Sequence, residues 1–189
     1  SEQGKRARLL QGLWCDLRLS KLNPAQESPP PNEPFVLVVD QSAGDCSIAL
    51  GLAGPRSFQQ MLREALRDHP DCTVVVKVHP DVIRGRARGH FRRRDLQHPR
   101  IHLCADGLHP AALLEQARAV YVVTSQMGFE ALLWGKPVHC FGMPFYAGWG
   151  LTRDRLPAPA RRRDGVALEA LVHAALVAGT RCVDPHRHR

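Results

Sequence analysis

Short runs of apolar, often β-branched residues recur along the chain. The clearest runs cover residues 35–39, 73–78, 120–123 and 137–141, and a weaker one covers 100–104. A strand with one face in water alternates apolar and polar residues, whereas these runs are apolar at most positions. They therefore predict strands that are buried on both faces of a sheet.

Segments with helical spacing of their apolar residues accompany these runs. They cover residues 5–18, 57–67, 110–118, 127–134 and 166–177. Ser57 is a suitable N-cap, Pro110 suits a first helical turn, and Gly135 suits a helix end. Strands that alternate with helices, and that are apolar throughout, predict an α/β fold built on a Rossmann-like, doubly wound parallel sheet.

The same pattern divides the chain into three parts. Residues 1–34 hold the first helix and a linker with five prolines, residues 35–182 form the Rossmann-like domain, and residues 183–189 form a tail. A length of 189 residues suits a single domain with its own core. No apolar run approaches the ~18 residues of a membrane helix, and no signal-peptide pattern follows the N-terminus. We therefore expect a cytoplasmic protein.

The charge balance is basic, with 26 Lys and Arg against 18 Asp and Glu. A positive net charge favours anionic partners such as phosphate groups, nucleic acid or an anionic membrane face. The alternative is an arginine-rich composition spread over solvated surfaces. The basic segments 84–94 and 161–163 lack interleaved aromatic residues, apart from Phe91, and no nucleic-acid-binding motif is present. We expect no nucleic-acid partner.

The chain has six cysteines, and none of them form a CxxC pair. A zinc site of the common spacing is therefore not expected. Cys104 and Cys140 lie in or beside strand-like runs, where a free cysteine packs as a small apolar residue. We expect the cysteines to be reduced and structural.

Two polar segments follow the first two predicted strands, at the edge of a parallel sheet where ligands bind. Residues 40–47 offer two carboxylates, an amide and hydroxyl groups, although the aspartates could simply cap a turn. In the second segment, Lys77 and His79 alternate with Val78 and therefore project to one face of the strand end. A cation beside an imidazole suits a phosphate or a phosphorylated leaving group.

Two further segments follow the later strands. Thr124 and Ser125 place two hydroxyl groups where a strand gives way to a helix, a position that favours anions. Glu130 lies further along this helix and could reach a ribose hydroxyl; the alternative is a helix cap followed by an exposed glutamate. Residues 141–150 combine four aromatic residues with three glycines. Such a loop could wall a nucleotide or sugar pocket, or could be a packed structural loop.

Together these segments resemble the KpsC/LipB family of capsular polysaccharide proteins. The motifs are Ser-Lys-Leu-Asn (20–23), Asp-Gln-Ser-Ala-Gly-Asp-Cys-Ser-Ile (40–48), Val-Lys-Val-His-Pro-Asp (76–81), Thr-Ser-Gln-Met-Gly-Phe-Glu-Ala-Leu (124–132) and Pro-Phe-Tyr-Ala-Gly-Trp-Gly-Leu-Thr (144–152). The last two are long and specific. The resemblance implies one half of a GT-B glycosyltransferase, the donor-binding lobe of a retaining β-Kdo transferase. Such an enzyme uses CMP-Kdo to build the Kdo linker of a capsular glycolipid.

The resemblance also implies roles for particular residues in donor binding. The His79-Pro80 pair is expected to contact the CMP phosphate, and Ser125, with Thr124 nearby, to hold the same phosphate. Lys77 is expected at the phosphate or the Kdo carboxylate. The helix that follows Thr124 and Ser125 in the motif of residues 124–132 is expected to contribute Gly128 as a donor contact and Glu130 as a contact to the ribose.

A retaining reaction implies a carboxylate nucleophile that forms a covalent sugar intermediate. We expect Asp45 to be this nucleophile, with Gln41 and His79 as the other catalytic residues. Asp40 lies on the same loop and is the competing candidate; the sequence does not separate the two. No metal and no other cofactor are expected.

The partners that the resemblance implies are a CMP-sugar donor, a glycolipid acceptor and an N-terminal GT-B lobe that this chain lacks. Peripheral contact with the cytoplasmic face of the inner membrane, and with a capsule assembly complex, is also expected. Two other functions stay open. One is a related GT-B nucleotide-sugar enzyme of the epimerase type, which would prefer UDP-sugars. The other is a non-catalytic lobe that only docks through its basic surface.

Overall fold

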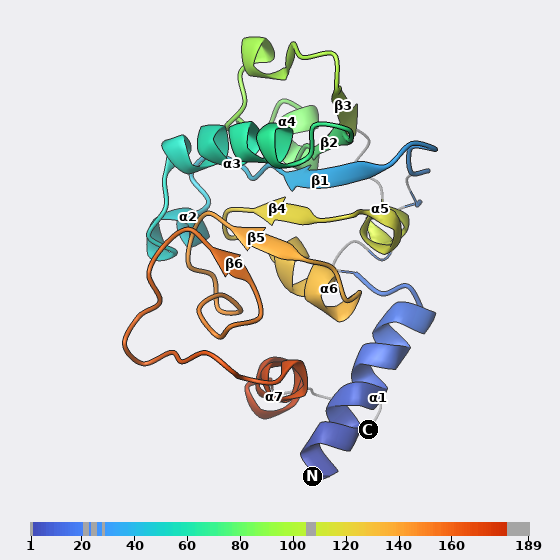
Figure 1. The fold of residues 1–189 in the computed structure, drawn as a ribbon, viewed down its shortest axis with the longest axis vertical. Coiled ribbons are helices and arrows are strands. Elements are labelled where there is room, and N and C mark those ends of the chain that lie inside the picture. Colours follow the sequence, from blue (N-terminus) through green and yellow to red (C-terminus); the bar gives the residue numbers. More distant parts are fainter. Residues whose placement is uncertain (1, 21–22, 24–25, 28, 105–108, 181–189) are drawn as a thin grey trace, which may run out of the picture.

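A parallel sheet forms the centre of the molecule (Figure 1). The structure is a computed structural model that describes residues 2–20, 23, 26–27, 29–104 and 109–180. Within them the strands are β1 (Phe35–Val39), β2 (Thr73–Lys77), β3 (Ile101–Cys104), β4 (Val120–Val122), β5 (Val138–Cys140) and β6 (Arg153–Asp154). Their order across the sheet is β3-β2-β1-β4-β5-β6, and all neighbours are parallel. This is the order of a Rossmann fold, as the sequence predicts.

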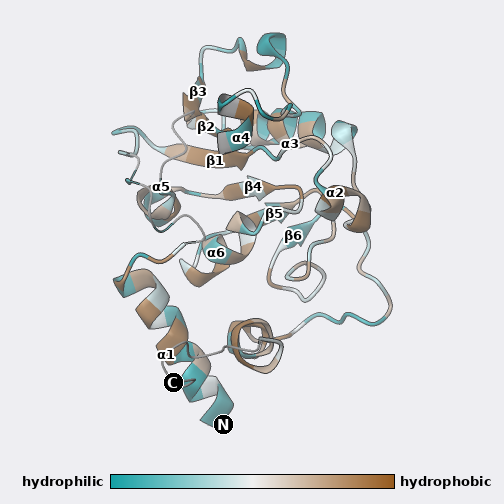
Figure 2. Ribbon diagram, turned by 180° about the vertical axis from the view of Figure 1, so that it is seen from behind, coloured by the Kyte–Doolittle hydropathy of each residue, from teal (hydrophilic) through white to brown (hydrophobic). Residues whose placement is uncertain are grey.

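Helices cover both faces of this sheet. The helices are α1 (Glu2–Asp16), α2 (Cys46–Leu50), α3 (Pro55–Asp68), α4 (Pro80–Ile83), α5 (Ala111–Gln116), α6 (Met127–Leu133) and α7 (Leu168–His173), with the 3-10 turn η1 (Arg93–Leu96) and the π-helical turn η2 (Ala174–Ala178). Alternate residues of β1 enter separate cores: Val36 and Val38 pack with α3, and Leu37 and Val39 with α5 and α6. Figure 2 shows the apolar β1 and β4 in brown and the hydrophilic β6 in teal.

The predicted elements are confirmed, with small changes at their ends. The assignment of Ser57 as an N-cap was wrong. Helix α3 begins at Pro55 after the N-cap Gly54, and the Ser57 hydroxyl accepts a bond from the backbone N–H of Gly54 (3.3 Å). Several short elements have no counterpart among the predicted ones: α2, α4, η1 and β6.

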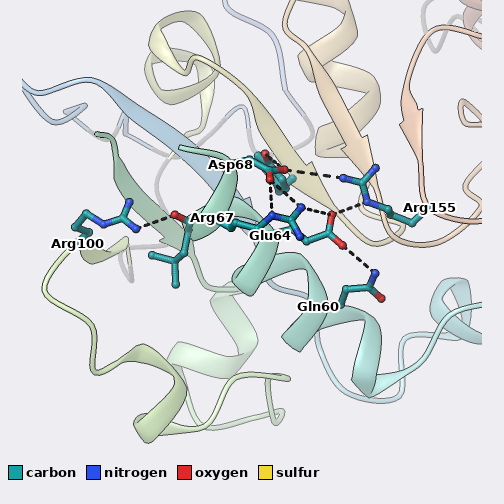
Figure 3. Close-up of polar contacts among 8 residues, drawn as sticks. Gln60, Glu64, Arg67, Asp68, Arg100 and Arg155 are labelled. Carbon is teal, nitrogen blue, oxygen red and sulfur yellow. Dashed lines mark hydrogen bonds and ion pairs between the residues drawn. The ribbon is translucent and has the colours of Figure 1, made fainter. Parts of the chain in front are cut away.

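The edge strand β6 is tied to α3 by a polar network (Figure 3). Arg155, which follows β6, donates from Nε to Oε2 of Glu64 and lies 4.0 Å from the carboxylate of Asp68. Gln60 donates to the other oxygen of Glu64 (2.9 Å). The network fixes the end of β6 next to β5, although β6 carries no apolar pattern of its own.

The N-terminal helix α1 packs against α7 and α6 at one end of the molecule (Figure 1). Ala7 is fully buried, and Gln11 donates to the backbone oxygen of Leu133 (2.9 Å). The helix of residues 1–34 therefore shares a core with the domain. The division at residue 35 stays a prediction, and the tail 183–189 lies outside the described residues. In the described ranges, no helix is both long and apolar enough to cross a bilayer.

Candidate functional site

The strand order reverses between β1 and β4, and their carboxyl ends open a crevice at this switch point. A cavity of about 370 Å³ occupies it. The polar residues in its lining are Asp40, Gln41, Asp45, Ser47, Lys77, His79, Thr124, Ser125 and Gln126, and Phe145 is its aromatic member. The fold therefore brings together side chains from four of the segments that the sequence singles out.

Gln41 joins the ends of β1 and β4. Its Oε1 accepts bonds from the backbone N–H (3.0 Å) and the hydroxyl (3.2 Å) of Thr124. Its Nε2 lies 3.1 Å from Oδ2 of Asp45 and 3.3 Å from Oγ of Ser47. The side chain is almost completely buried, so this amide fixes three cavity-lining groups relative to one another.

Asp45 is both a cap and a member of the cavity lining. Its Oδ1 accepts a bond from the backbone N–H of Ser47 (2.9 Å), which makes it the N-cap of α2. The capping role and the functional role are therefore compatible. Asp45 is exposed at the mouth of the cavity, so a ligand can reach its carboxylate.

Asp40, the competing carboxylate, has a different environment. It is only 4% exposed, and its Oδ1 accepts bonds from the backbone N–H groups of Gln41 (2.9 Å) and His90 (3.2 Å). Burial raises the pKa of Asp40 to about 6, although these two bonds oppose the rise. Asp40 thus anchors the segment around His90 while touching the cavity.

Lys77 and His79 reach the cavity together from the end of β2, as predicted. Nδ1 of His79 accepts a bond from the backbone N–H of Asp81 (3.2 Å). A neutral imidazole that accepts at Nδ1 carries its proton at Nε2, so His79 offers an N–H donor to a ligand. Pro80 begins α4, and its side chain lies outside the described part of the chain.

Thr124 and Ser125 form the junction between β4 and α6. Both are mostly buried, yet both line the cavity, and Oγ of Ser125 accepts a bond from the backbone N–H of Met127 (3.3 Å). The Tyr146 hydroxyl donates to the backbone oxygen of Ser125, which ties the aromatic loop to this junction. The hydroxyl of Ser125 is thereby held at the wall of the cavity.

Gly128 and Glu130 do not line the cavity. A Cβ at Gly128 would lie 2.6 Å from Cζ of the buried Tyr146, so this glycine admits the tyrosine ring. The Glu130 side chain is fully buried, so the alternative interpretation of Glu130 as an exposed glutamate is wrong. The assignment of both residues to donor contacts stays a prediction.

The aromatic loop divides its rings between the core and the cavity. Phe145 is 48% exposed and lines the cavity, whereas Tyr146 is fully buried. Arg162 donates to the backbone oxygens of Pro144 (2.6 Å) and Ala147 (2.7 Å), and it covers the ring of Trp149. The loop is therefore packed structurally and also contributes Phe145 to the cavity wall, while its role at a nucleotide or sugar stays a prediction. The sequence points to the loop but does not single out Phe145.

No group of three or more His, Cys, Asp or Glu side chains in the described ranges could hold a metal ion. The cysteines at positions 15, 46, 72, 104 and 140 are free, and Cys182 lies outside those ranges. The absence of a metal from the reaction stays an expectation.

Comparison with known proteins identifies the family. A family described as capsule polysaccharide biosynthesis protein matches residues 2–181. The chain belongs to this family. Relatives in it include the capsule polysaccharide modification protein LipA of Neisseria meningitidis serogroup A, 40% identical over 98% of this chain and 28% of the relative. The lipopolysaccharide-processing protein LpsZ of Rhizobium meliloti is 37% identical over 92% of this chain and 40% of the relative.

Two solved structures are similar in fold as well as sequence. The KpsC beta Kdo 2,4 transferase of Thermosulfurimonas dismutans is 41% identical, with a TM-score of 0.84 over 93% of this chain and 56% of that chain. The beta Kdo 2,7 transferase of the same KpsC is 30% identical, with a TM-score of 0.71. The expected resemblance to KpsC and the Rossmann-like fold are therefore confirmed. The chain spans little more than half of either KpsC structure and less than half of the curated relatives.

Proposed function

We propose that this chain is the donor-binding lobe of a Kdo transferase, which takes CMP-Kdo as its sugar donor. The observation that carries the proposal is the cavity at the β1–β4 switch point. It combines Lys77, His79 and the hydroxyls of Thr124 and Ser125, which suit a phosphate, with the carboxylate of Asp45. The two similar solved structures are Kdo transferases, which supports the same donor.

Donor binding in this proposal starts from the phosphate. Lys77 supplies the charge, and the Nε2–H of His79 and the hydroxyl of Ser125 supply hydrogen-bond donors. Phe145 offers an exposed aromatic face to the cytosine or the sugar. Glu130 keeps its proposed role at the ribose only if the segment around α6 rearranges on binding, because its side chain is fully buried.

The proposed chemistry is a double displacement. A carboxylate oxygen of Asp45 attacks the anomeric carbon of Kdo, and the bond from that carbon to the phosphate oxygen breaks, so that CMP leaves with the electron pair. An acceptor hydroxyl then attacks the same carbon, loses its proton to a base, and releases the Asp45 carboxylate. Two inversions give net retention.

The geometry favours Asp45 over Asp40 as the nucleophile. Asp45 is exposed at the cavity, whereas Asp40 is buried and bound to two backbone N–H groups. In an enzyme that carries both lobes, Asp45→Asn is expected to abolish turnover without unfolding the protein. Normal turnover in that variant would contradict the assignment.

The other partners follow from the same proposal. The acceptor is a capsular glycolipid, an N-terminal GT-B lobe completes the active site, and the basic surface lies near the cytoplasmic face of the membrane. The family is described as capsule polysaccharide biosynthesis protein, and LipA is named a capsule polysaccharide modification protein, which supports this setting.

Nucleotide preference tests the function and separates it from the epimerase-type alternative. The measurement is an NMR titration of the ¹⁵N-labelled chain with CMP and, separately, with UMP and UDP. The expected result is a larger response to CMP, centred on residues 40–47, 77–79 and 124–126. A stronger response to UDP at the same residues would favour the alternative enzyme class.

A further inference from the structure

The middle arginine of the basic segment 161–163 is partly buried, whereas its two neighbours are exposed. Arg162 lies between β6 and α7, and its Nη1 donates to the backbone oxygens of Pro144 (2.6 Å) and Ala147 (2.7 Å). These oxygens belong to the aromatic loop and stand on either side of Phe145. A charged guanidinium makes stronger hydrogen bonds to carbonyl groups than a neutral donor does. Arg162 therefore fixes the main chain before and after Phe145.

Trp149 binds the same loop. Its indole Nε1–H donates to the backbone oxygen of Phe145 (2.7 Å), and the Arg162 guanidinium lies 5.6 Å from the centre of the indole ring. A guanidinium over an indole face is a favourable cation–π contact. Arg162 and Trp149 thus bind three backbone oxygens of the loop between them, those of Pro144, Phe145 and Ala147. We refer to these two side chains as the loop clamp.

The loop has room for the Arg162 side chain because of Gly148. This glycine has a φ of 76°, in the left-handed region, and a Cβ there would lie 3.1 Å from Cδ of Arg162. The backbone N–H of Gly148 donates to Oδ2 of Asp154 (2.7 Å), which joins the loop to β6. The backbone N–H of Arg162 donates to the oxygen of Pro159 (2.8 Å). Further bonds therefore fix both the loop and the segment that carries Arg162.

The loop clamp bears on the cavity at the switch point through Phe145. The Phe145 ring is 48% exposed and lines this cavity, whereas neither Arg162 nor Trp149 lines it. The ring also contacts that of Phe129, with 5.2 Å between the two centroids. An aromatic ring that is already held in place loses less conformational entropy when a ligand stacks on it. The clamp therefore prepares one apolar wall of the cavity for a planar ligand.

We propose that Arg162, together with Trp149, is a positioning residue for donor binding. It holds Phe145 in the cavity wall, so that the nucleobase of the donor stacks on the phenyl ring. The inference rests on the proposed function, because it takes CMP as the ligand of the cavity. Arg162 acts through the aromatic loop and does not touch the donor. The basic segment 161–163 thus contributes its middle arginine to the architecture of the site rather than to a surface for anionic partners.

The test is a double-mutant cycle measured by calorimetric titration of CMP. Phe145→Ala removes the ring and is expected to weaken CMP binding roughly tenfold. Arg162→Met keeps an unbranched side chain beside Gly148 but removes the donors to both carbonyl groups. It is expected to weaken binding about fivefold, because the ring must then be ordered on binding. In the Phe145→Ala background the same change should have little effect, and an equal effect in both backgrounds would overturn the proposal.

Two further variants complete the cycle. Arg163→Met is the matched control, because it removes the same charge from an exposed neighbour, and it should bind CMP as the wild type does. Trp149→Phe keeps an aromatic ring and removes the bond to the Phe145 oxygen, so it tests the clamp even if Arg162→Met fails to fold. It is expected to weaken CMP binding only where Phe145 is present. Wild-type affinity in Trp149→Phe would overturn the proposal.

A measurement without ligand keeps this outcome separate from the proposed function. Hydrogen exchange of the Trp149 indole N–H, followed by NMR of the ¹⁵N-labelled chain, is expected to be faster in Arg162→Met and unchanged in Arg163→Met. Equal rates in wild type and Arg162→Met would overturn the clamp whether or not CMP binds. Failure of CMP to bind the wild type would contradict the donor lobe, and faster exchange would still support the clamp. CMP binding that does not depend on Arg162 would overturn its positioning role and leave the donor lobe standing.

Discussion

Nε2 of Gln41 lies 3.1 Å from Oδ2 of Asp45. The other end of the same amide binds the backbone N–H of Thr124, so the proposed nucleophile is positioned by a buried bridge between β1 and β4. A five-residue helix such as α2 is too short to hold a side chain rigidly by itself. The bridge therefore explains how an exposed carboxylate keeps a fixed place at the cavity.

Replacing Gln41 with Glu removes the Nε2 donor and places a second carboxylate beside Asp45. Like charges raise the pKa of such a pair in the folded state. The stability of Gln41→Glu relative to wild type should therefore fall as pH rises from about 4.5 to 7.5. Urea unfolding at several pH values measures this difference. Gln3→Glu, at an exposed position of α1, is the control. A loss of stability in Gln41→Glu that is the same at every pH would count against the Gln41 bridge.

The burial of the Asp40 carboxylate predicts a second dependence of the protein's stability on pH. Burial raises its pKa from the ordinary 3.8 to about 6 in the folded state. Between these values the folded protein binds more protons than the unfolded chain, so this group lowers stability as pH rises, and its full cost is present above pH 6. The cost is on the order of 3 kcal/mol at most.

Asp40→Asn removes this ionisation and keeps an oxygen for the N–H groups of Gln41 and His90. The stability of the variant relative to wild type is expected to increase between pH 4 and 6 and to level off above that range. Urea unfolding of both proteins across this range gives the comparison. A constant difference would show that Asp40 does not titrate in this window.

Gly128 tests the contact between α6 and the aromatic loop. Gly128→Ala places a Cβ 2.6 Å from Cζ of the buried Tyr146, and this overpacking should lower the free energy of unfolding by about 1–3 kcal/mol. Gly12→Ala in α1 meets no atom within 4 Å and should instead gain up to about 1 kcal/mol of helix propensity. Thermal unfolding measures both, and equal effects of the two changes would contradict the packing argument.

Much of the sheet is predictable from the sequence because the strands β1, β2, β4 and β5 are buried on both faces, whereas the edge strand β3 exposes two of its four residues. Val36 and Leu37 enter different cores, so both positions must be apolar, and the run is visible without any structure. The strand β6 shows the opposite case. Arg153 and Asp154 carry no apolar signal, and their place in the sheet depends on Arg155 contacting a helix some ninety residues earlier in the chain.

The candidate site is predictable to a smaller extent. The sequence places Lys77, His79 and Thr124 at strand ends, and the parallel topology brings strand ends together. It does not show that Glu130 is fully buried, because the burial of that side chain depends on packing around α6 that no local pattern records. Similarly, the sequence does not distinguish the adjacent aromatic residues Phe145 and Tyr146, yet Phe145 lines the cavity and Tyr146 is buried in the core.

Calorimetric titration of CMP tests the donor lobe most directly. The wild-type chain is expected to bind CMP at one site, and His79→Ala is expected to weaken binding at least about tenfold through loss of a hydrogen bond to a charged phosphate. His98→Ala is the matched control: its Nδ1 accepts from the N–H two residues later, as in His79, but the side chain is exposed and lies outside the cavity. His98→Ala should bind CMP as the wild type does. The absence of CMP binding to the wild-type chain, or equal affinities in both variants, would contradict the account.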